Sequence, residues 1–230
     1  ARAARSAGVP VHIDAVSALG QVPIDFRASG ASALSVSAHK IGGPVGVGAL
    51  VLGRYANADP LFHGGSQQRA RSGTQNVAGA VGFAAALDWA GLGTAGSTLE
   101  TAADRHTHMA ALRDRLIAGL RDVIPDAVLR GAAPGPGRLP GNAHFTFPEC
   151  QGDSLVFLLD AAGISASVGS ACQAGVAEVS HVLLAMGVPE EDAIGSLRFT
   201  RGPDSTAAEV DALLAALPDA VARGRRAGLS

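Results

Sequence analysis

Short runs of mostly apolar residues near the start of the chain predict three β-strands. They cover residues 9–15, 31–38 and 46–52. The first run delivers Asp14 near its end, and the second ends at His39 and Lys40. The third run is almost wholly apolar, which is typical of a strand that is buried on both faces. Polar residues therefore stand at the carboxyl ends of two strands, the edge at which open α/β sheets bind ligands.

Helical patterns dominate the rest of the chain. We expect helices over residues 75–92, 98–123, 153–162 and 180–186, and a last helix that begins with a capping box of Thr206 and Glu209. Further strands are expected at 143–147, near Ile164 and at 196–200. Residues 1–8 are typical of a helix end that Gly8 terminates. Because strands and helices alternate, the predicted fold class is α/β.

The composition indicates a compact globular chain. Hydrophobic residues make up 47% of the 230 positions and 30 are glycines, which excludes a disordered chain. The net charge of −2 argues against a nucleic-acid surface, and no apolar run reaches the ~18 residues that span a bilayer. Two cysteines, Cys150 and Cys172, are too few for a disulfide scaffold, which predicts a reducing cytoplasm.

The pattern also predicts where domains begin and end. The chain opens with what resembles the tail of a helix and has no initiator Met, so we expect the sequence to begin inside a domain. We place a boundary near residue 95, which gives a first domain over 1–95 and a second over 96–230.

The basic residues show the clearest bias. Lys40 is the only lysine among 18 basic residues, and the others are all arginines. Arginine stays protonated in proteins, whereas a lysine amine can lose its proton and act as a nucleophile or base. Lys40 is therefore a candidate for a Schiff base to a carbonyl or to pyridoxal phosphate. The alternative is a solvated lysine in a composition that favours arginine.

Six short motifs occur in a fixed order along the chain. They are His12-Ile-Asp-Ala, Ser37-Ala-His-Lys-Ile-Gly-Gly-Pro, His63-Gly-Gly, Arg71-Ser-Gly-Thr, Gly169-Ser-Ala-Cys and Ser196-Leu-Arg-Phe. In this order the chain resembles a cysteine desulfurase of the class V pyridoxal-phosphate aminotransferase superfamily, over about the C-terminal three-fifths of a typical member. The resemblance implies fold type I: part of a large cofactor-binding domain with a mostly parallel sheet, then a smaller α/β domain that carries a cysteine loop.

The resemblance assigns a role to five residues around the cofactor. Asp14 pairs with the pyridine nitrogen, Lys40 forms the Schiff base and moves the Cα proton, and Ser37 and His39 bind the phosphate. Thr74 reaches the phosphate of a neighbouring subunit, which implies a homodimer with shared sites. Taken singly, Asp14 is also explained as a helix N-cap, and the hydroxyls and His39 by turn chemistry.

Two further residues match positions that handle the substrate. Cys172 matches the nucleophile that accepts sulfur, and Arg198 matches the group that binds the substrate carboxylate. A buried, unreactive cysteine and a surface ion pair are the alternatives; we assign the buried role to Cys150. Ser17 departs from the family pattern because it stands where many relatives carry a Gln. His106 and His108 are two residues apart on a helix, so no metal site is expected there.

The resemblance implies a pyridoxal 5'-phosphate enzyme that converts L-cysteine to L-alanine and holds the sulfur as a persulfide on Cys172. A sulfur-acceptor protein, such as an iron–sulfur scaffold or a tRNA-thiolation protein, is the expected partner. No nucleic-acid or membrane partner is expected. A selenocysteine lyase, another class V aminotransferase, or a truncated chain without catalytic activity remain alternatives.

Overall fold

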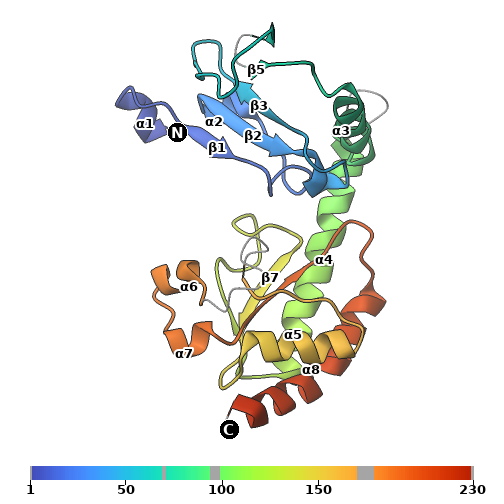
Figure 1. Cartoon of the computed structure of the whole chain (residues 1–230). Helices are drawn as coiled ribbons and strands as arrows, with labels where there is room; N and C mark the ends of the chain where they lie inside the picture. Colours follow the sequence, from blue (N-terminus) through green and yellow to red (C-terminus); the bar gives the residue numbers. More distant parts are fainter. Residues whose placement is uncertain (1, 69–70, 94–98, 170–178, 229–230) are drawn as a thin grey trace. The chain divides into compact units, whose positions relative to one another are not determined.

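A computed structural model describes residues 2–68, 71–93, 99–169 and 179–228. The chain divides into two compact units, Ala1–Asp104 and Arg105–Ser230, and both combine helices with strands (Figure 1). The predicted α/β class is confirmed: the sheet of the first unit combines parallel and antiparallel pairs, and the other two sheets are antiparallel.

The first unit is built on a three-stranded sheet in the order β1-β2-β3. Strands β1 (His12–Asp14) and β2 (Ala33–Ser37) are parallel, and Asp14 is level with Ser35. Strand β3 (Gly48–Leu52) is antiparallel to β2, and Ser37 is opposite Gly48. Other elements of this unit are α1 (Arg2–Ser6), α2 (Phe26–Ser29), β4 (Ser66–Gln68), β5 (Arg71–Ser72) and α3 (Val77–Trp89).

The prediction that the third strand is buried on both faces is wrong for this chain. Leu50 and Val51 of β3 are 51% and 39% exposed, and adjacent strand residues point to opposite faces. Both faces of β3 are therefore accessible. An apolar run indicates that the side chains favour burial. Whether they are buried depends on other elements that pack on the two faces of the strand.

A short 3₁₀ helix, η1 (Ala38–Ile41), joins β2 to a glycine-rich turn. Its residues Ala38 and Ile41 are buried in a small core with Phe83, Ala86 and Ala90, which belong to α3 and its C-terminal end. Residues three apart share a face in a 3₁₀ helix. The packing of η1 against α3 therefore fixes which side chains of the turn remain accessible.

The second unit is built on an antiparallel sheet in the order β6-β7-β8. The bounds of its elements are β6 (Val128–Leu129), β7 (Asn142–Thr146), α5 (Gly152–Ala161), α6 (His181–Ala185), α7 (Glu190–Ala193), β8 (Ser196–Thr200) and α8 (Ala207–Gly228). Helix α4 (Leu99–Val123) begins before the division between the units and supplies most of its buried residues to the second.

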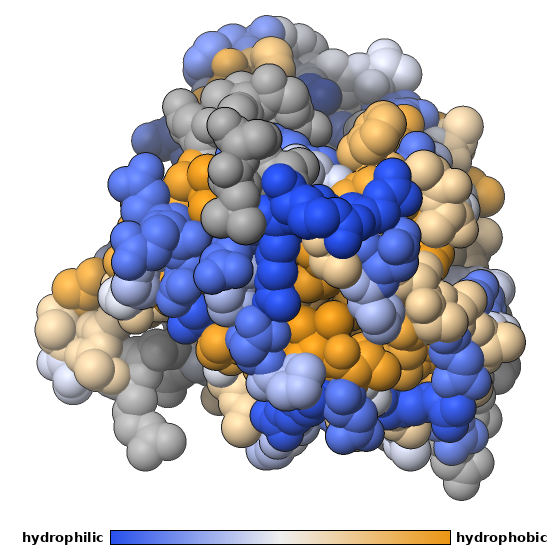
Figure 2. All heavy atoms as spheres, turned by 90° about the horizontal axis from the view of Figure 1, so that it is seen from below, coloured by the Kyte–Doolittle hydropathy of each residue, from blue (hydrophilic) through white to orange (hydrophobic). Residues whose placement is uncertain are grey.

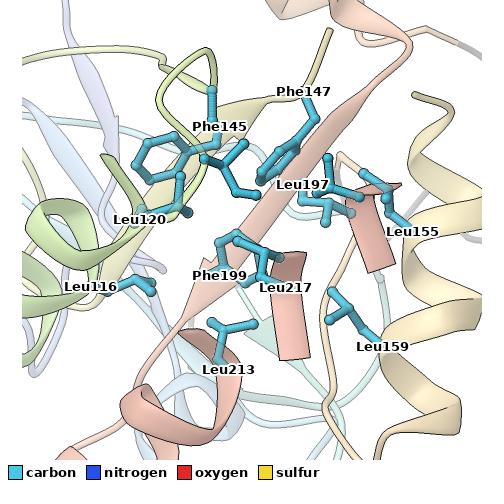
Figure 3. Close-up of a cluster of buried hydrophobic side chains, with 14 of the residues drawn as sticks. Leu116, Leu120, Phe145, Phe147, Leu155, Leu159, Leu197, Phe199, Leu213 and Leu217 are labelled. Carbon is cyan, nitrogen blue, oxygen red and sulfur yellow. The ribbon is translucent and has the colours of Figure 1, made fainter. Parts of the chain in front are cut away.

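One face of this sheet forms the largest core in the described structure. Phe145 of β7 is level with Leu197 of β8, and both are fully buried. Leucines from α4, α5 and α8 converge on these side chains (Figure 3). Because strand residues alternate in direction, the neighbouring residues His144 and Arg198 point to the opposite, polar face.

Most predicted elements are present with slightly shifted ends. The capping box is confirmed: the Thr206 N–H donates to Glu209 Oε2 at 2.9 Å, and the Glu209 N–H donates to Thr206 Oγ1 at 3.3 Å. The strand near Ile164 is wrong, because in its place there is only an isolated bridge between Ser167 and Arg198. The chain turns directly after α5 at Gly163, where φ is 77°.

The surface mixes polar and apolar areas. On the face drawn in Figure 2, hydrophilic residues surround smaller hydrophobic patches. Within the described ranges, no helix combines the length and apolar character that a membrane span requires.

Candidate active site

Lys40 belongs to a short 3₁₀ helix whose first and last residues are buried. Ala38 is fully buried and Ile41 is 6% exposed, whereas His39 and Lys40 are both exposed. Gly42 ends the 3₁₀ helix with a φ of 81°, a conformation that favours glycine. The backbone thus fixes the start of the lysine side chain while its amine stays accessible.

Close packing behind the turn requires a second glycine. A Cβ on Gly43 would lie 2.9 Å from the Cβ atoms of both Ala38 and Ala86. The Gly43 N–H also donates to the Ala38 carbonyl at 2.9 Å. The glycine motif that follows Lys40 therefore serves to seat the turn tightly against α3.

Ser37 and His39 are joined at the end of β2. Ser37 Oγ and His39 Nδ1 are 2.7 Å apart, and Ser37 Oγ also lies 3.5 Å from the Val47 carbonyl. A hydroxyl and an imidazole in contact offer hydrogen-bond donors that suit an anionic group. The structure brings these two predicted phosphate ligands together, next to Lys40.

Asp14 lies at the same end of the sheet. Because β1 and β2 are parallel and Asp14 is level with Ser35, Ser37 is only two residues further along the neighbouring strand. The exposed Asp14 carboxylate accepts one hydrogen bond, from the Val16 N–H to Oδ1 at 2.9 Å. The structure thus gathers an amine, a carboxylate, a hydroxyl and an imidazole at one sheet edge.

Thr74 belongs to the first unit but to a separate segment after β5. It is exposed and follows Gly73, whose N–H donates to the Gly65 carbonyl at 2.9 Å. In this segment the Arg71 guanidinium lies 5.0 Å from the centre of the Phe62 ring. An exposed hydroxyl at this position is compatible with a contact to another molecule.

Arg198 lines a pocket of about 400 Å³ in the second unit. The pocket lies on the polar face of the sheet, and its wall includes Leu139, Val182 and Met186. No hydrogen bond or ion pair joins the Arg198 side chain to the described residues, and its buried Nε lacks a partner there. Arg198 is therefore a cation available to a ligand.

Two other arginines line the same pocket but are engaged. Arg130 donates from Nε to Thr146 Oγ1 at 2.9 Å and from Nη2 to Asp192 Oδ2 at 3.1 Å. Arg138 donates from Nε to the Ala132 carbonyl at 2.5 Å and from Nη2 to the Arg130 carbonyl. These arginines build the pocket and raise its positive potential, which favours an anionic ligand.

His144 is the residue of the pocket that the sequence analysis missed. It is opposite Arg198 in the β7–β8 register. Burial, followed by the charges of Arg198, Arg138 and Arg130, lowers the pKa of His144 from 6.5 to about 4. The imidazole is therefore neutral at pH 7. Alternation along 142–146 could have placed His144 on the polar face, but not beside Arg198.

Of the two cysteines, Cys150 lies within the described part of the chain and Cys172 does not. Cys172 lies outside the described residues; Gly169 before it and Ser180 after it both line the Arg198 pocket. Cys150 is 2% exposed, and its Sγ lies 3.8 Å from the Val221 carbonyl. Burial raises the pKa of the Cys150 thiol, so this residue is the buried cysteine that was expected. No cluster of three or more potential metal ligands occurs among the residues described here.

Comparisons with known proteins identify the family that the motifs indicate. The family model of aminotransferase class-V matches residues 1–213. An IscS-like cysteine desulfurase from Mycobacterium tuberculosis (strain ATCC 25618 / H37Rv) is 54% identical over 224 residues, which are 97% of this chain and 55% of that protein. The cysteine desulfurase NifS of Azotobacter vinelandii is 39% identical over 226 residues, 98% of this chain and 54% of that protein.

Solved structures lead to the same fold. A NifS-like protein matches with a TM-score of 0.78 and 34% identity, over 94% of this chain and 53% of that one. The chain spans about half the length of the curated relatives it matches. Taken together with the sheet edge around Lys40, the match over residues 1–213 shows that this chain belongs to the aminotransferase class-V family.

Proposed function

We propose that this chain is part of a pyridoxal 5'-phosphate-dependent cysteine desulfurase. The observation that carries the proposal is the position of the only lysine, exposed on an anchored turn beside Ser37 and His39 and at the same sheet edge as Asp14. Names of the relatives, which are cysteine desulfurases, support the same reaction.

The residues at this edge fit the cofactor. Lys40 supplies an accessible amine for covalent attachment, and Asp14 supplies a carboxylate for the ring nitrogen. Ser37 and His39 supply donors for the phosphate. When bound, pyridoxal phosphate provides an electron sink for charge that develops at the substrate Cα. Lys40 then moves the proton at that carbon.

The second unit supplies the groups for substrate and sulfur. Arg198 binds the carboxylate of L-cysteine, and the thiolate of Cys172 attacks the substrate sulfur. A sulfur–sulfur bond forms as the carbon–sulfur bond breaks, so that L-cysteine and the enzyme thiol become L-alanine and an enzyme persulfide. Gly169 lines the same pocket as Arg198. Cys172 follows Gly169 by three residues, and three residues of chain span at most about 11 Å.

We also propose the setting of the reaction. The exposed Thr74 contacts the cofactor phosphate of a second subunit in a homodimer. The persulfide passes to a sulfur-acceptor protein, such as an iron–sulfur scaffold, in the cytoplasm, where the two cysteines of this chain stay reduced.

Borohydride reduction tests the role of Lys40 in the natural polypeptide that contains this chain. Reduction should fix the cofactor covalently to the peptide that includes Lys40, and the Lys40→Arg variant, which keeps the charge, should lose the label. Recovery of the label on a different peptide would refute the assignment. A protein without a visible cofactor absorption band would instead favour a chain that only binds partners.

Two cysteine variants test the sulfur step. Cys172→Ala should abolish persulfide formation but still change the visible spectrum when cysteine is added, because substrate binding precedes sulfur transfer. The matched control Cys150→Ala should form persulfide normally, since Cys150 is buried in the core of the second unit and does not line the pocket. If Cys172→Ala releases alanine at the full rate without an added thiol, another class V reaction is favoured. Comparison of alanine release from cysteine and selenocysteine separates a desulfurase from a selenocysteine lyase.

A further inference from the structure

His144 and Arg198 are direct neighbours across two strands. The backbone N–H and C=O of Arg198 pair with Ser167, at 2.7 and 3.3 Å, while the His144 carbonyl accepts from the Arg130 N–H at 2.8 Å. The backbone groups of the two residues therefore point away from each other. They form a non-hydrogen-bonded pair, the type in which opposite side chains lie closest.

The side-chain atoms that these residues leave unused are complementary. Arg198 Nε and His144 Nε2 are both buried, and neither has a hydrogen-bond partner among the described residues. The Nε–H of arginine is always a donor, and a neutral imidazole has one acceptor nitrogen. A buried polar group without a partner is unfavourable. A hydrogen bond between the two atoms would satisfy both.

We propose that His144 is a positioning residue for Arg198, and that its Nε2 accepts a hydrogen bond from Arg198 Nε–H when a carboxylate occupies the pocket. The inference rests on the proposed function in one respect, which is that Arg198 binds the substrate carboxylate. With Nε held by His144, the Nη1 and Nη2 groups remain for the ligand. These two groups bind a carboxylate through parallel hydrogen bonds, which fixes the orientation of the substrate.

The surroundings keep His144 in the form that this role needs. A protonated imidazole has no acceptor nitrogen. Burial and the charges of Arg198, Arg138 and Arg130 hold the pKa of His144 at about 4. The other two arginines already bond to Thr146, Asp192 and backbone carbonyls, which leaves Arg198 as the described pocket arginine without a partner.

Variants of the natural polypeptide separate positioning from packing. His144→Leu removes the acceptor, and we expect the KM for L-cysteine to rise about tenfold while kcat changes less than twofold. His144→Gln keeps an oxygen acceptor at similar reach and should restore most of the affinity. In an Arg198→Lys background, which has no Nε–H, His144→Leu should have no further effect. Equal KM values for wild type and His144→Leu, or additive effects of the two substitutions, would overturn the proposal.

A spectroscopic measurement decides the inference without turnover. In protein labelled with ¹⁵N at histidine, the His144 signals are those lost in His144→Gln. At pH 7 its Nε2 should be unprotonated, and saturating L-alanine should shift the Nε2 resonance in the wild type but not in Arg198→Lys. A protonated Nε2, or no response to L-alanine, contradicts the proposal. If the wild type releases no alanine from cysteine, the proposed function fails, and this measurement still decides the role of His144.

Discussion

The neutral state of His144 makes the stability of the protein depend on pH in a defined range. The ordinary pKa of histidine is 6.5, and in the folded protein that of His144 is about 4. Above pH 6.5 the residue is neutral in the folded and the unfolded chain, so its protonation does not lower the free energy of unfolding. As the pH falls below 6.5, the unfolded chain binds a proton that the folded chain does not, and the folded state loses stability until both are protonated near pH 4.

The size of the effect follows from the two pKa values. Their difference corresponds to about 3 kcal/mol, at about 1.4 kcal/mol for each pH unit. We expect the free energy of unfolding of the wild type to fall by this amount, relative to His144→Gln, between pH 6.5 and 4. The comparison with the variant removes the contributions that the two proteins share, so that the difference between them reports His144 alone.

Urea unfolding of the two proteins at half-unit pH intervals measures the difference. Burial is the largest cause of the lowered pKa and the three arginines come after it, so 1 M salt, which screens charges, should leave most of the effect. Parallel stability curves for the wild type and His144→Gln would refute the reasoning. They would mean that the His144 ring takes up its proton in the folded protein as readily as in water.

Two further substitutions and one chemical modification test the packing described above. Phe145→Ala should lower the free energy of unfolding by about 3–5 kcal/mol in urea titrations, because Phe145 is fully buried in the core of the second unit. Gly48→Val should cost about 1–3 kcal/mol and weaken cofactor binding measured by absorbance, since a Cβ there would lie 2.6 Å from the Val36 carbonyl. Iodoacetamide at pH 7 should leave Cys150 unmodified in the folded protein, as mass spectrometry would show, because burial raises the pKa of its thiol and shields it.

Local signals account for the parts of the fold that the sequence predicted well. The strand at 196–200 matches β8, and the capping box at Thr206 forms both of its hydrogen bonds. The capping box depends on contacts within four residues, and the strand is marked by its own alternation of apolar and polar residues, although its partner β7 is distant in the sequence. The exposure of β3 could not be predicted in this way, because burial of a strand depends on elements far away in the sequence.

The candidate site also contains residues that the sequence predicted and residues that only the structure brings together. Asp14, Ser37, His39 and Lys40 were expected near one another, because they end or directly follow two neighbouring strands. The parallel pairing of β1 and β2 places them at one edge. His144 and Arg198 are more than fifty residues apart, and only the register of β7 and β8 brings them together. The role of Cys172 stays a prediction, since that residue lies outside the described part of the chain.

The way in which Arg138 holds the loop of residues 131–137 has a consequence for how the pocket can evolve. Its guanidinium bonds to the carbonyls of Ala132 and Arg130, and backbone carbonyls are the same whichever side chain a residue carries. Substitutions at loop positions that glycine geometry does not restrict can therefore change the chemistry of one pocket wall without moving it. Sequences that keep an arginine at this position could therefore vary the ligand that the pocket accepts while the path of the loop stays unchanged.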